Sequence, residues 1–284
     1  MYSILLTGFG PFPGVAKNPT ADVVARFDGK EMTYAGRTGV VHGVVLDVAW
    51  ESGPNAEGRP IRGAPDALRD AVARYRPELL VSMGVATSER SRFRIETSPT
   101  DKRSDAVADV AGRKPLNSRG HPNGPPELTT NLPAPWIIGE LDRRGIRMDE
   151  SREAGKYLCE AITYEGSLLV SEKKSSLVLS GFVHVPNVYA TDDALKAGFM
   201  TAEQRAGLPT LETIVDAMKT VIEISLYMIP AWATPMTKGT AADRSPVAMS
   251  TSSQHRTSRA ARPCSSSRRS GERKPRRRSR RRVR

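Results

Sequence analysis

Short apolar runs that end close to a glycine or a proline recur along the chain. They occupy residues 3–7, 40–48, 79–86 and 176–186. Runs of this length that are rich in Val, Ile and Leu are typical of strands that are covered on both faces of a sheet. The pattern therefore predicts four buried strands.

Segments with helical character lie between and after these strands. Asn18 is a predicted N-cap and Pro19 suits the first position of the helix that follows. Further helices are predicted at residues 64–77, 135–145, 150–170 and 210–229. Because strands alternate with helices, we expect an α/β fold: a single three-layer α/β/α domain with a mostly parallel or mixed central sheet.

Two segments break this pattern. Residues 97–132 are rich in Pro, Gly, Asn and charge, which predicts a long loop, and long loops inside compact domains tend to be functional. Residues 238–284 contain Ser, Arg, Ala, Pro and Thr and almost no large apolar side chain. Such a segment cannot offset the entropy lost on ordering. We expect a folded domain at residues 1–232 and a disordered Ser- and Arg-rich tail at residues 233–284.

The charge of the chain is concentrated in this tail. The 284 residues carry a net charge of +12, yet 14 of the 43 Lys and Arg residues and one of the 31 Asp and Glu residues lie beyond residue 250. Residues 1–250 are therefore nearly neutral and have no electrostatic reason to bind phosphate. Nucleic acid is expected to bind only nonspecifically, through the tail.

The two cysteines, Cys159 and Cys264, are far apart, so a disulfide framework is not expected. The N-terminal residues lack the positive region of a signal peptide, and no apolar run reaches the roughly 18 residues of a membrane span. We therefore expect a cytoplasmic location and no membrane partner. A homo-oligomer is compatible with the sequence.

Three residues have side chains suited to catalysis. Cys159 is the only cysteine of the predicted domain, and a thiol near a helix N-terminus gains thiolate character. His184 ends a buried strand, where functional groups of open α/β sheets gather, and Glu96 follows the strand at residues 79–86. Each also has an ordinary structural explanation, respectively a buried thiol, a hydrogen-bonded core histidine and a surface carboxylate, and spacing alone does not unite them.

Four motifs do unite these residues. They are LTGFGPFPG with a following Asn-Pro (residues 6–19), residues 84–96, AGKYLC (154–159) and GFVHVP (181–186). In this order they resemble the pyroglutamyl peptidase I family of cysteine peptidases, over about residues 1–228. The resemblance implies a catalytic triad of Cys159, His184 and Glu96, acyl transfer from N-terminally pyroglutamylated peptides, and neither a metal nor another cofactor.

The same resemblance implies a pocket for the pyroglutamyl lactam ring. Phe9, Phe12, Val107, Tyr157 and Leu158 are the residues that would line it. Aromatic walls suit a small, uncharged ring that needs few hydrogen bonds. Phe9 and Phe12 are also compatible with ordinary core packing.

Several positions depart from the family pattern. Val85 replaces a usual Gln, Ala106 aligns with a family Arg, and Glu160 stands where Asn is typical. One extra residue lies before Arg90, and residues 97–103 are polar where the family is apolar. These changes leave the three triad residues in place but alter the predicted pocket wall. They favour, as an alternative, a related cysteine hydrolase that acts on another N-acyl or lactam substrate.

Two further alternatives concern the tail. The domain could be an inactive body that carries a nucleic-acid-binding tail, although no aromatic residues accompany the Arg blocks at residues 276–282. The tail also has the composition that a GC-rich gene produces when it is translated out of frame. In that case the tail would have no role of its own.

Overall fold

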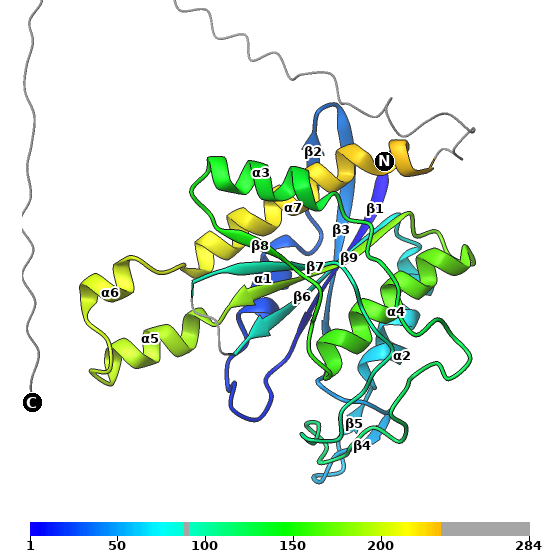
Figure 1. The fold of residues 1–284 in the computed structure, drawn as a ribbon, viewed down its shortest axis with the longest axis horizontal. Coiled ribbons are helices and arrows are strands. Elements are labelled where there is room, and N and C mark those ends of the chain that lie inside the picture. The colour runs from blue at the N-terminus through cyan, green and yellow to red at the C-terminus, as the bar shows by residue number, and fades with distance from the viewer. Residues whose placement is uncertain (88–90, 234–284) are drawn as a thin grey trace, which may run out of the picture. The chain divides into compact units, whose positions relative to one another are not determined.

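The predicted strands form the centre of one mixed sheet. The computed structural model describes residues 1–87 and 91–233, and within them seven strands pair in the order β2-β3-β1-β6-β9-β7-β8 (Figure 1). The strands are β1 (Tyr2–Phe9), β2 (Glu31–Tyr34), β3 (Arg37–Leu46), β6 (Leu79–Ala86), β7 (Phe93–Glu96), β8 (Met148–Ser151) and β9 (Leu179–Pro186). A separate small ribbon consists of β4 (Gly53–Pro54) and β5 (Pro60–Ile61).

The direction of the strands brings three of them together at one end of the sheet. β3, β1, β6 and β9 run parallel, whereas β2 is antiparallel to β3 and β7 is antiparallel to β9. In this register Gly84 of β6 lies beside His184 of β9, and Arg94 of β7 lies on the other side of the same histidine. The carboxyl end of β9 therefore lies between that of β6 and strand β7.

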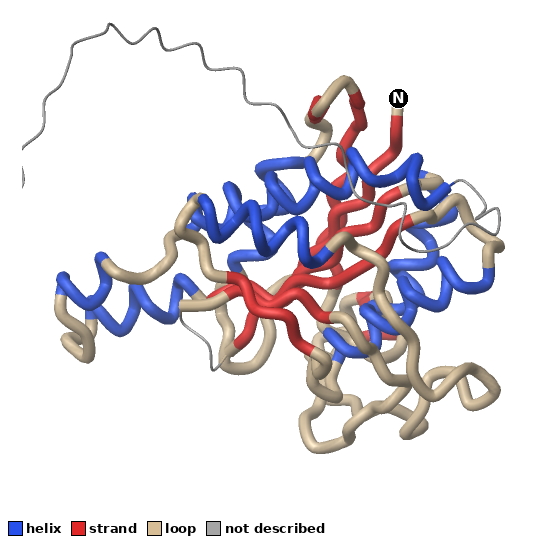
Figure 2. The backbone as a smooth tube through the Cα atoms, turned by 45° about the horizontal axis from the view of Figure 1, so that its top comes forward, coloured by secondary structure: helices blue, strands red, loops and turns tan. Residues whose placement is uncertain are grey.

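Helices cover both faces of the sheet. α1 (Pro19–Phe27), α3 (Ala134–Arg143) and α7 (Leu211–Ala233) pack on one face, and α2 (Ala64–Tyr75) and α4 (Leu158–Glu172) on the other (Figures 1 and 2). α5 (Val188–Lys196) and α6 (Ala202–Ala206) project away from the sheet. The predicted three-layer α/β/α fold is confirmed, with a mixed sheet.

The alternation of side chains along each strand divides the core into two parts. Val81 and Val183 pack with α1, α3 and α7, whereas Leu80 and Phe182 pack with α2 and α4. Successive side chains of a strand point to opposite faces, so Gly84 and His184 face the same side as Leu80 and Phe182. This is the side on which α4 begins.

The predicted start of α1 is confirmed. Asn18 caps the helix by accepting a hydrogen bond from the amide of Thr20, and Pro19 is the first helical residue. Thr20 Oγ1 in turn accepts a hydrogen bond from the amide of Phe9 at 2.9 Å. These bonds attach the helix to the end of β1 and close the glycine- and proline-rich loop between them.

The structure corrects one predicted helix. Residues 150–157 are not helical, because residues 148–151 form β8, which pairs with β7, and a loop then leads to α4. Gly155 in this loop has a φ of +90°, a left-handed conformation that helices do not contain. The short strands β2, β7 and β8 and the helices α5 and α6 were not predicted.

Other predictions have different outcomes. Residues 97–132, all of which the structure describes, form neither helix nor strand, as predicted. The predicted tail lies outside the described residues, apart from its first residue, which ends α7, so its disorder stays a prediction. Among residues 1–87 and 91–233, no helix has the length and apolar character required to cross a membrane.

Candidate active site

Glu96, Cys159 and His184 converge at the end of the sheet where β6, β7 and β9 meet. Glu96 is the last residue of β7, His184 lies near the end of β9, and Cys159 is the second residue of α4. Glu96 and His184 are 1% and 5% exposed, so the carboxylate and the imidazole are shielded from water. The structure thus brings together the three side chains that only the motifs united in the sequence.

A short hydrogen bond fixes the imidazole. His184 Nδ1 lies 2.7 Å from Glu96 Oε1, which leaves the other ring nitrogen for Cys159. Thr130 donates a hydrogen bond of 2.8 Å to the carbonyl of Glu96 and so holds the end of β7. Glu96 Oε2 is buried and has no hydrogen-bond partner among the described residues. Within that part of the chain, the carboxylate therefore forms its hydrogen bond with His184 alone.

The charges at this site favour a protonated imidazole. Burial by itself would lower the pKa of His184, but the charge of the Cys159 thiolate, a hydrogen bond to Cys159 and the Glu96 carboxylate together raise that pKa from 6.5 to about 9. An opposite charge within a few ångströms favours the charged form of a titratable group. A protonated imidazole is therefore the expected state of His184 at neutral pH.

The position of the thiol depends on a glycine in the neighbouring strand. A Cβ atom at Gly84 would lie 2.8 Å from Cys159 Sγ and 2.7 Å from the ring of Phe182. Contacts this close are essentially never seen for real side chains, so any larger residue at position 84 would displace the thiol. Cys159 also lies in the first turn of α4, where backbone amides have no helical acceptor and the helix dipole favours a negative charge.

Cys159 and His184 lie in the wall of a cavity of about 470 Å³. Phe12, Val107 and Tyr157 line this cavity, whereas Phe9 and Leu158 line a narrower cavity that Cys159 also borders. Phe12 and Tyr157 border both cavities. All five predicted pocket residues are therefore near the thiol, although Val107 is 57% exposed and belongs to the rim.

The Tyr157 hydroxyl attaches the cavity to the long segment at residues 97–132. It donates a hydrogen bond of 3.0 Å to the carbonyl of Ala108. Burial, the charge of Asp109 and the charge of Cys159 raise the pKa of Tyr157 to about 12, so the hydroxyl keeps its proton at neutral pH. No group of three or more His, Cys, Asp or Glu side chains that could hold a metal occurs in the part of the chain that the structure describes.

Two departures from the family pattern contact each other. Glu160 replaces the usual Asn, and its Oε1 atom accepts hydrogen bonds of 2.6 Å from both the amide and the hydroxyl of Thr100. Thr100 belongs to the polar stretch at residues 97–103. Burial and the nearby charge of Glu96 raise the pKa of Glu160, while the bonds from Thr100 oppose this shift. The altered segment is thus attached to α4 one residue after Cys159.

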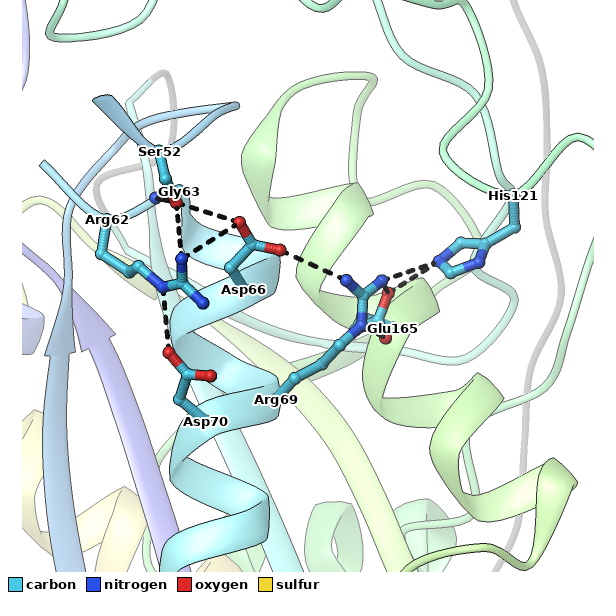
Figure 3. Close-up of polar contacts among 8 residues, drawn as sticks. All are labelled: Ser52, Arg62, Gly63, Asp66, Arg69, Asp70, His121 and Glu165. Atoms are coloured by element: carbon cyan, nitrogen blue, oxygen red, sulfur yellow. Dashed lines mark hydrogen bonds and ion pairs between the residues drawn. The ribbon is translucent and has the colours of Figure 1, made fainter. Parts of the chain in front are cut away.

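A polar network fixes another part of the segment at residues 97–132, at a greater distance from the thiol. Arg69 of α2 forms two hydrogen bonds of 2.7 Å with the carboxylate of Glu165 on α4 (Figure 3). His121 Nε2, from the long segment, lies 2.8 Å from Glu165 Oε2. Asp101 accepts hydrogen bonds from the amides of Gly120 and His121 and thereby links the beginning of the segment to residues 120–121.

Sequence reasoning missed several residues of the cavity wall, and Arg94 is the one that lies beside the proposed base. Arg94 lines the same cavity as Cys159 and His184. Residues 93–96 alternate between apolar and charged side chains, which is the signal of a strand with one polar face. This alternation indicates that Arg94 and Glu96 lie on the same face of one strand.

Comparison with known proteins relates this geometry to a family. The family model described as pyroglutamyl peptidase matches residues 2–227. Pyrrolidone-carboxylate peptidase from Thermococcus litoralis is 26% identical and covers 80% of this chain and 94% of its own, and that from Gloeobacter violaceus is 29% identical over 76% and 96%. The crystal structure of pyrrolidone carboxyl peptidase from Pyrococcus furiosus superposes with a TM-score of 0.67 at 26% identity, covering 80% of this chain and 99% of its own. The chain belongs to the pyroglutamyl peptidase family of cysteine-type omega peptidases.

Proposed function

We propose that this protein removes an N-terminal pyroglutamyl residue from peptides, with Cys159 as nucleophile, His184 as acid and base, and Glu96 as the group that orients the imidazole. The observation that carries the proposal is the 2.7 Å bond between His184 Nδ1 and Glu96 Oε1, beside a thiol in the first turn of a helix. A nucleophile, a base and a group that orients the base are the requirements for acyl transfer.

The reaction follows from these positions. The Cys159 thiolate attacks the pyroglutamyl carbonyl carbon, a C–S bond forms, and the oxyanion that develops can accept a hydrogen bond from the first-turn amide of Cys159. The C–N bond then breaks, and the imidazolium of His184 transfers its proton to the departing amine. Water, deprotonated by His184, hydrolyses the thioester, which releases pyroglutamic acid and restores the thiolate–imidazolium pair.

The cavities suit the two parts of such a substrate. The narrow cavity, of about 30 Å³, is bordered by Phe9, Phe12, Val48 and Leu158, apolar side chains of the kind that contact a small, uncharged lactam ring, and it would have to widen to admit one. The wider cavity at Cys159 and His184 leaves room for the remaining peptide. N-terminally pyroglutamylated peptides are thus the proposed substrates. The proposed location is cytoplasmic, as the scarcity of cysteines suggests.

A second candidate is a related cysteine hydrolase that acts on another N-acyl or lactam substrate. Val85, which stands where the family resemblance leads us to expect Gln, borders both cavities. A valine cannot donate or accept the hydrogen bonds that an amide side chain offers to a lactam ring. The same triad would carry out the same acyl transfer on either substrate.

A panel of fluorogenic amides tests the proposal. The purified protein should hydrolyse the pyroglutamyl amide with a kcat/KM at least tenfold above those of the prolyl and N-acetylalanyl amides (about 1.4 kcal/mol in barrier height). The Cys264→Ser variant is the matched control and should keep this activity, because Cys264 has no part in the proposed chemistry. Preferential hydrolysis of another amide would favour the second candidate, and hydrolysis of none would contradict both.

A further inference from the structure

Arg94 lies directly beside the proposed base. In the antiparallel pairing of β7 and β9, Arg94 is the partner of His184, so both side chains project from the same face of the sheet. Directly opposite residues of such a pair have their Cβ atoms about 4.5–5.5 Å apart. Arg94, Cys159 and His184 also line the same cavity. Arg94 is therefore part of the wall of the cavity in which we propose that the reaction occurs.

The guanidinium of Arg94 lacks a counter-ion among the described residues. Its Nε atom is buried without a hydrogen-bond partner, and the side chain forms no ion pair with any described carboxylate. Glu96 bonds to His184 instead, and Glu153, which lines the same cavity, is exposed and lies beyond ion-pair distance. Arg92, two residues away, does have a partner, since it pairs with Asp149 at 3.3 Å.

An arginine in this position is suited to bind an anion. Arg94 is only partly exposed, and its Nε is buried without a partner, which leaves a cationic donor unsatisfied in the cavity wall. A carboxylate would supply the missing partner, because it can accept two parallel hydrogen bonds from one guanidinium. Arg94 borders the wide cavity but not the narrow apolar one, so the anion would lie on the leaving-group side of the thiol.

We propose that Arg94 determines specificity by binding a carboxylate on the residue that follows pyroglutamate. This inference rests on the proposed function. The carboxylate has two sources, which share the same chemistry: the free C-terminus of a pyroglutamyl dipeptide, or an acidic side chain at the second position of a longer peptide. Arg94 contacts the substrate in either case and carries out no bond-making step.

Peptide pairs that differ only in charge test the proposal. The C-terminus is tested by pyroglutamyl-alanine against its amide, and the side chain by pyroglutamyl-glutamate amide against pyroglutamyl-glutamine amide. The wild type should favour the anion of at least one pair by roughly 10-fold or more in kcat/KM, and Arg94→Gln should lose that preference. Arg94→Lys should keep part of it, because the charge remains but the paired donors do not.

Arg92→Gln is the matched control, since it removes the same charge from the same segment. It should keep the wild-type ratio for both pairs. Equal ratios for wild type and Arg94→Gln in both pairs would overturn the proposal, as would an equal loss in Arg92→Gln. The pair that responds identifies the source of the carboxylate. If no pyroglutamyl peptide were cleaved at all, the proposed function and the peptide preference would both be wrong.

A second measurement tests anion binding by Arg94 without a peptide substrate. Iodoacetate carries a carboxylate and iodoacetamide does not, so the ratio of their rates of alkylation at Cys159, followed by peptide mass mapping, reports a cation beside the thiol. Arg94→Gln should lower this ratio by roughly 3- to 10-fold relative to wild type and Arg92→Gln. An unchanged ratio would show that Arg94 does not attract anions to the thiol, even if pyroglutamyl peptides are hydrolysed.

Discussion

At the scale of the residue, the site depends on three unlike side chains held in one arrangement. The carboxylate of Glu96 is buried and bonded to His184 Nδ1, and the thiol of Cys159 lies where only a glycine fits in the adjacent strand. The base must move a proton, whereas the carboxylate only orients and stabilises the imidazole. The two residues should therefore differ in importance.

His184→Ala should lower kcat/KM for a pyroglutamyl amide by roughly 10²–10⁴-fold, since it removes general acid–base catalysis. Glu96→Gln should cost less, because the amide still accepts or donates a hydrogen bond at Nδ1 and only the charge is lost. Steady-state rates of both variants, compared at equal far-UV circular dichroism, check this order. Wild-type rates in both variants would show that the motifs misplaced the triad.

The pH profile should report the raised pKa of His184. Because its pKa rises from 6.5 to about 9 in the folded protein, the imidazolium persists at neutral pH and is lost as the pH rises through 9. Its contribution to stability is likewise complete below the unfolded pKa and lost as the pH rises through the folded one. Activity should therefore fall above about pH 9, with an apparent pKa that belongs to the Cys–His pair.

Glu96→Gln provides the control for this profile. The carboxylate is one of the groups that raise the pKa of His184, so its removal should shift the basic limb of kcat/KM to lower pH. A basic limb at the same pH in both proteins would mean that another group controls it. The comparison needs only the fluorogenic assay, repeated over a series of buffers.

Individual residues also show where sequence reasoning ends. Asn18 and Pro19 could be assigned to a helix start because capping is a local interaction. Glu96, by contrast, looks like a surface carboxylate when taken alone, and its burial results from pairing with β9, which is distant in sequence. The family motifs supplied this long-range information. They could not reveal the contact between Glu160 and Thr100, since both residues lie outside the four motifs, and Arg94 lies within residues 84–96 without being one of the positions that carry the resemblance.

At the scale of the element, α2, α4 and the segment at residues 97–132 are tied together by Glu165. Its side chain is 3% exposed, and Arg69 and His121 both contact its carboxylate (Figure 3). A buried carboxylate has lost its hydration by water, and the attraction of a nearby cation compensates for that loss. Removal of the cation therefore destabilises the folded state. Arg62, which lies just before α2, forms ion pairs of a different kind. Its partners, Asp66 and Asp70, have exposed carboxylates (Figure 3).

Arg69→Met should lower the free energy of unfolding by about 1–3 kcal/mol, the range for hydrogen bonds that involve a charged group. The partial exposure of Arg69 places the expected loss toward the lower end, because water screens the pair. Arg62→Met is the matched control and should cost clearly less, because its ion pairs with Asp66 and Asp70 are open to solvent. Urea denaturation measures both. Equal losses would show that the contact with Glu165 has no special role.

Elements differ in how well the sequence predicts them. Residues 79–86 form β6 with the predicted bounds, because a continuous apolar run between turns is a local signal of a buried strand. Residues 150–157 were predicted as helix, yet part of this stretch forms β8 because a strand partner is available in β7. Four-residue strands such as these carry too few positions for a clear period, so tertiary pairing decides their structure.

At the scale of the whole molecule, the proposed site and the excess of basic residues lie in different parts of the chain. The residues of the site all lie between positions 9 and 184, and the family model ends at residue 227. The excess of basic residues lies beyond residue 250. Nothing in the proposed chemistry requires that charge, so catalysis and polyanion binding should be separable.

Deletion of residues 240–284 should leave the thermal midpoint and the rate on a pyroglutamyl amide unchanged. Retention on heparin should fall sharply, because 15 Lys and Arg residues are removed with this segment. In the full chain, retention should also weaken as salt screens the charge. A large loss of rate or of stability in the truncated protein would mean that the segment docks on the domain.

The central claim is that Cys159 is the nucleophile that cleaves pyroglutamyl peptides. The most direct measurement compares the rate on a pyroglutamyl amide of wild type, Cys159→Ser and Cys264→Ser, each verified as folded by circular dichroism and thermal midpoint. The account predicts that Cys159→Ser loses essentially all activity, that Cys264→Ser retains it, and that iodoacetamide inactivates in step with labelling of Cys159. A folded Cys159→Ser variant with wild-type activity would contradict the account.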